Sequence, residues 1–177
     1  MNYFKEFAVP ALVLTIICLV VSTALVASNN LTAPMIEKTN LEQANAARAE
    51  VYPAASEFEK IEANLTEEGA EVYKASDNSG VVITTQTQGY GGDYVVMAGI
   101  DKDGKITGVK VTSNSETPGL GTKTTVPEYL EKYVSKASKD EISGVDNVAG
   151  ATISSTALKT CLNTAMDIFD TVKGELE

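Results

Sequence analysis

Hydrophobic residues follow three different patterns along this chain, and the first is a continuous run. Residues 7–27 are 21 consecutive positions without a charge, most of them apolar. A helix needs about 20 such residues to cross a bilayer, whereas the apolar part of a cleaved secretory signal is about 7 to 15 residues long. We therefore predict a retained transmembrane helix at residues 7–27 after a cytoplasmic N-terminus at residues 1–6. The positive charge of Lys5 ahead of the span favours export of the remainder of the chain.

The second pattern is a polar, alanine-rich stretch. Residues 35–52 contain no glycine and many helix-forming residues, Pro34 suits a first helical turn, and Pro53 ends the stretch. Because its apolar positions are mostly alanine, the segment is more typical of a stalk or a lid than of a core helix. We expect a helical stalk within residues 34–60, followed by one folded domain at residues 61–177.

The third pattern consists of short segments rich in Val, Ile, Thr and Tyr, separated by Gly, Asn and Asp. They predict antiparallel strands at residues 71–75, 81–88, 94–100 and 106–113. Residues 101–105 form the expected hairpin loop between the last two strands, where Gly104 takes a positive φ.

Two helices are expected after the strands. Pro127 suits the first turn of a short helix at residues 127–136. Between Leu158 and Val172, apolar residues recur at spacings of three and one, which predicts a packed helix at residues 154–172. The expected fold class is therefore α+β: an N-terminal transmembrane helix, then one domain with a mostly antiparallel sheet and a packed C-terminal helix.

Composition excludes several kinds of chemistry. The chain has no histidine, and 14 Lys+Arg against 24 Asp+Glu leave a net charge of −10. Imidazole bases, Ser-His-Asp triads and histidine-ligated metals are therefore excluded. Cys18 and Cys161 are too few for a thiolate zinc site or an iron–sulfur cluster, and an acidic chain without a basic stripe does not suit nucleic acid. We expect no metal site, and any redox or group-transfer chemistry requires a bound organic cofactor.

Residues 146–156 are the first segment with the composition of a ligand site, at the start of the C-terminal helix. Its small and hydroxyl-bearing residues are Gly150, Ala151, Thr152, Ser154, Ser155 and Thr156. A helix N-terminus offers unpaired N–H groups and a partial positive charge, both of which stabilise a phosphate. The same residues suit an ordinary Ser/Thr cap entered by a small-residue turn, so their spacing leaves both interpretations open.

Residues 115–123 are the second such segment. Gly119 and Gly121 flank Leu120, so the backbone can approach a flat ligand closely, and Pro118 stiffens the entry to the turn. A Gly-rich loop without a fixed spacing pattern is equally typical of an ordinary surface loop.

Together the two segments resemble the FMN-binding domain family. Residues 146–152 are similar to its flavinylation motif, Asp-x-x-(Ser/Thr)-Gly-Ala-Thr, and the Glu-Thr-Pro-Gly-Leu-Gly loop at residues 116–121 is the other hallmark. Gly89-Tyr90-Gly91-Gly92 ahead of a strand is part of the same likeness. With one N-terminal anchor, the architecture resembles the G subunits of Rnf electron-transport complexes and the related C subunits of Na+-translocating NADH:quinone reductases.

This resemblance implies FMN bound covalently through its phosphate to Thr152. A flavin transferase would use FAD as donor, with the Thr152 hydroxyl as acceptor and AMP leaving. Asp146 matches the acidic position of the motif, which implies a role in recognition or transfer. The other implied cofactor-binding residues are Glu116, Thr117, Gly119, Leu120, Gly121, Gly150, Ala151, Ser154 and Ser155.

Two positions depart from the family pattern. Ala149 stands where Ser or Thr is usual, which removes one hydroxyl from the motif. Asn114 stands where many relatives have histidine, so an amide replaces the imidazole. Neither departure touches the acceptor hydroxyl.

The implied function is electron transfer within a membrane complex. By resemblance, the complex moves electrons between reduced ferredoxin and NAD and couples this to Na+ or H+ translocation. This subunit would be single-pass in the inner or plasma membrane, carry its FMN on the extracytoplasmic side, and contact the other membrane subunits. Two other classes stay open: a stand-alone exported flavoprotein reductase or electron-transfer module, and a membrane-anchored binding domain in which Thr152 is only part of a helix cap.

Overall fold

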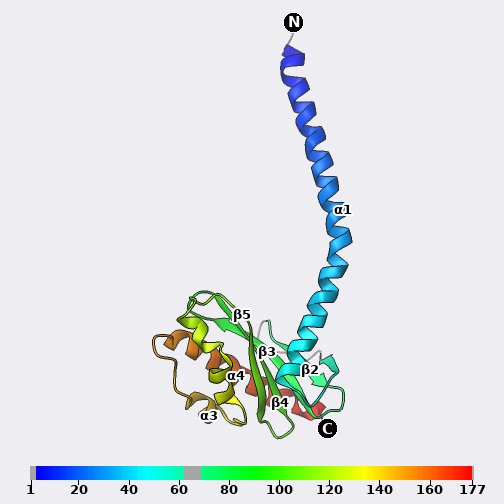
Figure 1. The fold of residues 1–177 in the computed structure, drawn as a ribbon. Helices are drawn as coiled ribbons and strands as arrows, with labels where there is room; N and C mark the ends of the chain where they lie inside the picture. The colour runs from blue at the N-terminus through cyan, green and yellow to red at the C-terminus, as the bar shows by residue number, and fades with distance from the viewer. Residues whose placement is uncertain (1–2, 62–68, 177) are drawn as a thin grey trace. The chain divides into compact units, whose positions relative to one another are not determined.

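The computed structural model describes residues 3–61 and 69–176 (Figure 1). The chain divides into two compact units, residues 1–44 and residues 45–177. Helix α1 is Tyr3–Val51, and within it Val9–Ala33 is long and apolar enough to cross a membrane. None of the residues in its most apolar stretch is buried within the protein, as expected for side chains that would face lipid.

The stalk expected at residues 34–60 is helical only as far as Val51, within one residue of the end that the sequence pattern predicts for its helix. Helix α1 ends at Val51, because Pro53 has no N–H to donate and disfavours helical backbone at the residue before it. Phe58–Ile61 form strand β1 instead, so the expected domain boundary between residues 60 and 61 falls inside a strand. Two of the four residues of β1 are charged, and only its pairing with the next strand, residues 71–75, identifies it as a strand.

The second unit contains a five-stranded antiparallel sheet in the order β1-β2-β3-β4-β5. Its other strands are β2 (Glu71–Ala75), β3 (Gly80–Gln88), β4 (Asp93–Asp101) and β5 (Ile106–Asn114). The four strands expected from the sequence are confirmed to within one residue. Gly104 has a φ of 78° in the hairpin between β4 and β5, as expected, and its N–H donates to the Asp101 carbonyl at 2.9 Å.

The main core lies between this sheet and helix α4 (Thr152–Val172), which crosses one of its faces (Figure 1). The buried residues of α4 include the apolar stripe expected from the sequence: Leu158, Cys161, Leu162, Ala165, Met166, Phe169 and Val172. On the opposite sheet face, Val82 and Met97 pack with Val51 and Tyr52 at the end of α1. Strands β3 and β4 are thus covered on both faces.

Short helices fill the segment between β5 and α4: η1 (Gly121–Thr124), α2 (Pro127–Leu130), η2 (Glu131–Tyr133) and α3 (Lys139–Ser143), while η3 (Lys173–Glu175) follows α4. The helix expected at residues 127–136 therefore ends early. Beyond Tyr133 the backbone pairs with the start of β5: Ser135 N–H donates to the Ile106 carbonyl at 2.7 Å, and Ile106 N–H donates to the Lys136 carbonyl at 2.9 Å. These bonds compete with continuation of the helix.

Candidate functional site

Helix α4 begins two residues earlier than the sequence pattern predicts. Ala151 is the N-cap residue and provides no side-chain cap, while Thr152 is the first residue of the helix. Ser154 and Ser155, which the sequence suggests as caps, lie within the first turn of the helix and are buried. The cap interpretation is therefore wrong for both serines. Within the described residues, no side chain accepts a hydrogen bond from the backbone N–H groups of the first turn.

Ser154 instead bonds to Glu116, which is the central side chain of the site. The Glu116 residue is only 6% exposed. Its Oε2 accepts a 2.7 Å hydrogen bond from Ser154 Oγ, and its Oε1 accepts a 2.8 Å hydrogen bond from the Tyr90 N–H. One carboxylate thus joins three segments: the loop before β4, the loop after β5 and the first turn of α4.

Two glycines make room for this carboxylate. A Cβ at Gly121 would lie 2.3 Å from Glu116 Oε2, and a Cβ at Gly89 would lie 2.3 Å from Glu116 Oε1. Both distances are far below van der Waals contact. Gly89 and Gly121 are therefore required by the buried acid.

The loop at residues 115–121 has a defined shape. Asn114 Oδ1 accepts a 3.2 Å hydrogen bond from the Glu116 N–H, which turns the chain at the end of β5. The Asn114 amide thus has a local structural role. Gly119 has a φ of 75°, and its N–H donates to Thr122 Oγ1 at 2.9 Å.

A buried hydroxyl chain holds the far end of the same loop. Thr124 Oγ1 donates to the Gly121 carbonyl at 2.7 Å and lies 2.7 Å from the Tyr94 hydroxyl. Burial raises the pKa of Tyr94 to about 12, so this phenol stays protonated at neutral pH. The chain of hydroxyls fixes Gly121 against the sheet.

Two hydrogen bonds hold the segment before α4 in place. The Tyr129 hydroxyl donates to the Asp146 carbonyl at 3.1 Å, and Ser155 Oγ accepts from the Val148 N–H at 3.0 Å. The Asp146 residue is exposed, as a recognition role would require. Gly150 has a φ of 80°, a conformation that residues with a Cβ rarely adopt.

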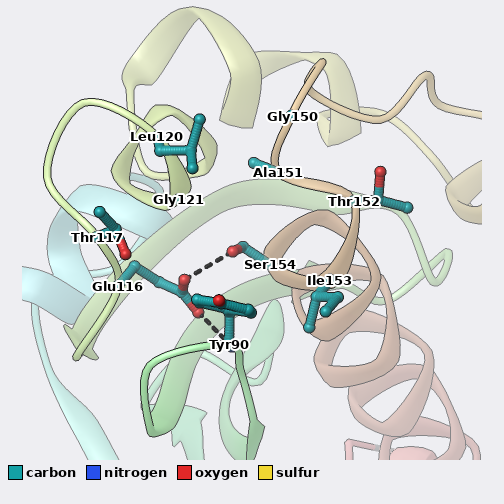
Figure 2. Close-up of a pocket in the computed structure, with 10 residues that line it drawn as sticks. All are labelled: Tyr90, Glu116, Thr117, Leu120, Gly121, Gly150, Ala151, Thr152, Ile153 and Ser154. Atoms are coloured by element: carbon teal, nitrogen blue, oxygen red, sulfur yellow. Dashed lines mark hydrogen bonds between the residues drawn. The ribbon is translucent and has the colours of Figure 1, made fainter.

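These segments enclose a pocket of about 560 Å³ (Figure 2). Its lining residues are Tyr90, Glu116, Thr117, Leu120, Gly121, Gly150, Ala151, Thr152, Ile153 and Ser154. The two predicted segments, which are about 30 residues apart in the sequence, therefore meet around one cavity. Of the predicted cofactor-binding residues, Gly119 and Ser155 do not line it: Gly119 has no atom within 4 Å of its Cβ position, and Ser155 lies under the preceding loop.

Two residues of the pocket, Tyr90 and Ile153, are not among the cofactor-binding residues predicted from the sequence. Tyr90 belongs to the Gly89–Gly92 segment, whose glycines were a usable signal, whereas Ile153 is a single apolar residue within a hydroxyl-rich run and carries no signal of its own. Together with Leu120 they surround the pocket with apolar surface. Tyr90 is 68% exposed, Ile153 is 55% exposed and Leu120 is 44% exposed. Exposed apolar residues that converge on a cavity are typical of a ligand site.

Thr152 lies at the edge of this cavity (Figure 2). The residue is exposed, and its hydroxyl makes no hydrogen bond within the described part of the chain. Gly150 leaves the approach to the Thr152 hydroxyl open. A Cβ at position 150 would lie 3.3 Å from Leu120 Cδ1 and would narrow this approach. A free alcohol, uncapped helical N–H groups and flat apolar walls together fit FMN, whose phosphate needs donors and whose ring needs apolar surface. Among the described residues, no cluster of His, Cys, Asp or Glu could hold a metal ion.

Comparisons with known proteins agree with these features. The family model of the FMN-binding domain matches residues 89–167. The G subunit of the Na(+)-translocating ferredoxin:NAD(+) oxidoreductase complex of Acetobacterium woodii is 31% identical over 89% of this chain and 89% of its own. The G subunit of the ion-translocating oxidoreductase complex of Methanosarcina acetivorans is 31% identical over 98% of this chain and 100% of its own.

A solved structure gives the same fold. The crystal structure of Shewanella oneidensis NqrC superposes with a TM-score of 0.51 at 22% identity, covering 72% of this chain and 71% of the other. This likeness confirms the α+β fold with its antiparallel sheet and C-terminal helix. The identities and coverage above show that the chain belongs to the family of G subunits of ion-translocating oxidoreductase complexes and contains an FMN-binding domain.

Proposed function

We propose that this protein is a membrane-anchored electron carrier of an ion-translocating ferredoxin:NAD oxidoreductase complex, with FMN joined through its phosphate to Thr152. The observation that carries the proposal is the position of the Thr152 hydroxyl. It is exposed and unbonded at the edge of the pocket, on the first residue of an uncapped helix. Relatives named as subunits of such complexes support the assignment.

Attachment is a phosphoryl transfer at this hydroxyl. The Thr152 oxygen bonds to the FMN phosphorus of FAD, the pyrophosphate bond breaks, AMP leaves, and the hydroxyl proton is released. The small residues Gly150 and Ala151 give a flavin transferase access to the alcohol. The N–H groups of the first turn and the positive end of the helix then stabilise the phosphodiester charge.

Bound FMN supplies the redox chemistry by accepting and passing on electrons. The residues of the pocket orient the group. Leu120, Tyr90 and Ile153 provide apolar surface for the flavin ring, and Glu116 fixes the loops that carry two of them. No side chain of the pocket is assigned a role as catalytic acid, base or nucleophile.

Intact mass tests the attachment directly. Full-length protein purified from its own host, or co-expressed with a flavin transferase, should gain the mass of one FMN less one water and fluoresce in a denaturing gel. Thr152→Ala should lose both signals. Thr156→Ala is the matched control, because Thr156 is an exposed threonine one turn along the same helix and outside the pocket. An unmodified wild-type mass would contradict the proposal and favour a simple anchored binding domain.

Co-purification separates the complex from a stand-alone flavoprotein. A component of an oxidoreductase complex should elute with other membrane proteins in mild detergent. A lone exported reductase should elute alone and still carry flavin.

We also propose that the FMN-binding domain lies on the extracytoplasmic side of the membrane. Lys5, the only basic residue ahead of the apolar span, supports a cytoplasmic N-terminus. Protease added to spheroplasts should digest the domain, whereas protease outside inverted vesicles should leave it intact. The reverse pattern would place the flavin in the cytoplasm.

A further inference from the structure

Glu116 is the one acidic side chain among the residues that line the pocket, and none of the others is basic. The residue is 6% exposed and lines the cavity. Both of its oxygens accept hydrogen bonds, one from a backbone N–H and one from a hydroxyl, which is the bonding pattern of an ionised carboxylate. No ion pair joins it to a basic side chain in the described part of the chain.

The electric field of such a charge extends across the cavity. A buried anion without a cation partner is screened by neutral dipoles only, in surroundings far less polarisable than water. Two neutral donors reduce its field but do not cancel it. A group that fills the cavity therefore lies in the field of Glu116, whichever way that group is turned.

Resting on the proposed function, we propose that the charge of Glu116 lowers the reduction potential of the flavin in this pocket. Reduction of FMN at neutral pH takes up two electrons from a reductant and one proton from solvent and leaves a negative charge on the ring. The Glu116 carboxylate repels that charge and favours the oxidised form. Glu116 is thus a positioning residue for the loops and also the residue that makes this carrier a stronger reductant.

Glu116→Gln removes the charge with little change in shape. The Gln carbonyl oxygen can accept from the Tyr90 N–H, and the Gln amide nitrogen can donate to Ser154 Oγ, so both bonds that join the three segments are kept. We expect E116Q to raise the midpoint potential. A tenfold increase in the reduced-to-oxidised ratio at fixed potential would appear as about 30 mV for this two-electron couple.

The experiment is an anaerobic dithionite titration of full-length, flavin-loaded protein in detergent, followed by flavin absorbance. Wild-type loading is first established by intact mass, so failure of the proposed function is seen separately. E116D keeps the charge and should stay near the wild-type potential. D103N removes an equal charge at the exposed β4–β5 hairpin, at the opposite end of β4 from the pocket, and should cause no shift.

Every outcome decides the question. The proposal is wrong if loaded E116Q has the wild-type potential, or if E116D shifts as far as E116Q. Should E116Q carry no flavin, E116N and E116D form a second pair that is matched in length and differs in charge. If neither neutral variant carries flavin, the carboxylate serves attachment and not the potential, and the proposal is again overturned.

Discussion

Ser154 Oγ donates a 2.7 Å hydrogen bond to Glu116 Oε2 across 38 residues of sequence. Both residues are buried, at 1% and 6% exposure. Ser154 is in the first turn of α4, two residues after Thr152, so this bond also determines where the Thr152 hydroxyl lies. The stability of the pocket and the position of the acceptor alcohol therefore depend on the same contact.

Ser154→Ala should destabilise the second unit by about 1.5–3 kcal/mol, because it removes a hydrogen bond to a buried charged group and leaves Oε2 unpaired. Urea unfolding followed by circular dichroism measures the loss. Thr156→Ala is the control: its hydroxyl is exposed and bonds only to the Thr152 carbonyl, so its removal should cost no more than about 0.5 kcal/mol. Equal losses of unfolding free energy in the two variants would show that the bond to Glu116 contributes no more than an exposed hydrogen bond.

Gly121→Ala should disturb the same contact from the other side. The new Cβ would lie 2.3 Å from Glu116 Oε2 and 3.0 Å from Ser154 Oγ, so the carboxylate must move. Overpacking of this kind costs about 1–3 kcal/mol, and flavin loading should fall with it. Gly174→Ala has no atom within 4 Å of the new Cβ and should be neutral. Wild-type stability and loading in G121A would mean that the loop has more freedom than the contact implies.

The local elements of this fold could be predicted, whereas the contacts between them could not. Strands β2 to β5 follow from β-branched segments bounded by turn residues, and both hallmark segments are recognisable in the sequence alone. Strand β1 was missed because its four residues form a strand only by pairing with β2. The first turn of α4 was misjudged for a similar reason: Ser154 looks like a cap in the sequence, but its acceptor belongs to a loop 38 residues away.

Lys159→Met should loosen the segment that precedes Thr152. Lys159 Nζ donates to the carbonyls of Ser143 and Val145, at the end of α3, where a cation also suits the negative end of a helix. We expect a loss of about 1 kcal/mol in unfolding free energy and slower transfer of FMN to Thr152 in a timed loading assay.

Lys173→Met is the matched control for this variant. Lys173 pairs with Asp170 three residues away on the surface, and such exposed pairs contribute at most about 1 kcal/mol and often nothing. K173M should load flavin at the wild-type rate. If K159M also loads at that rate, the lysine does not position the acceptor segment.

Cys161 should make the protein lose stability at alkaline pH. Burial between α4 and the sheet raises the pKa of this thiol from 9.0 to about 11. Between these values the unfolded chain has released the thiol proton and the folded chain still holds it, so the free energy of unfolding falls as pH rises. The contribution is fully present below pH 9, and its loss by pH 11 is on the order of 2 kcal/mol.

Cys161→Ala isolates this effect. The substitution creates a cavity and lowers stability at every pH, so the informative quantity is the slope of unfolding free energy between about pH 8 and pH 11. The wild type should fall more steeply than C161A by the amount above. Parallel curves would mean that the thiolate forms as readily in the folded domain as in the unfolded chain, and hence that water reaches the buried face of α4 at Cys161.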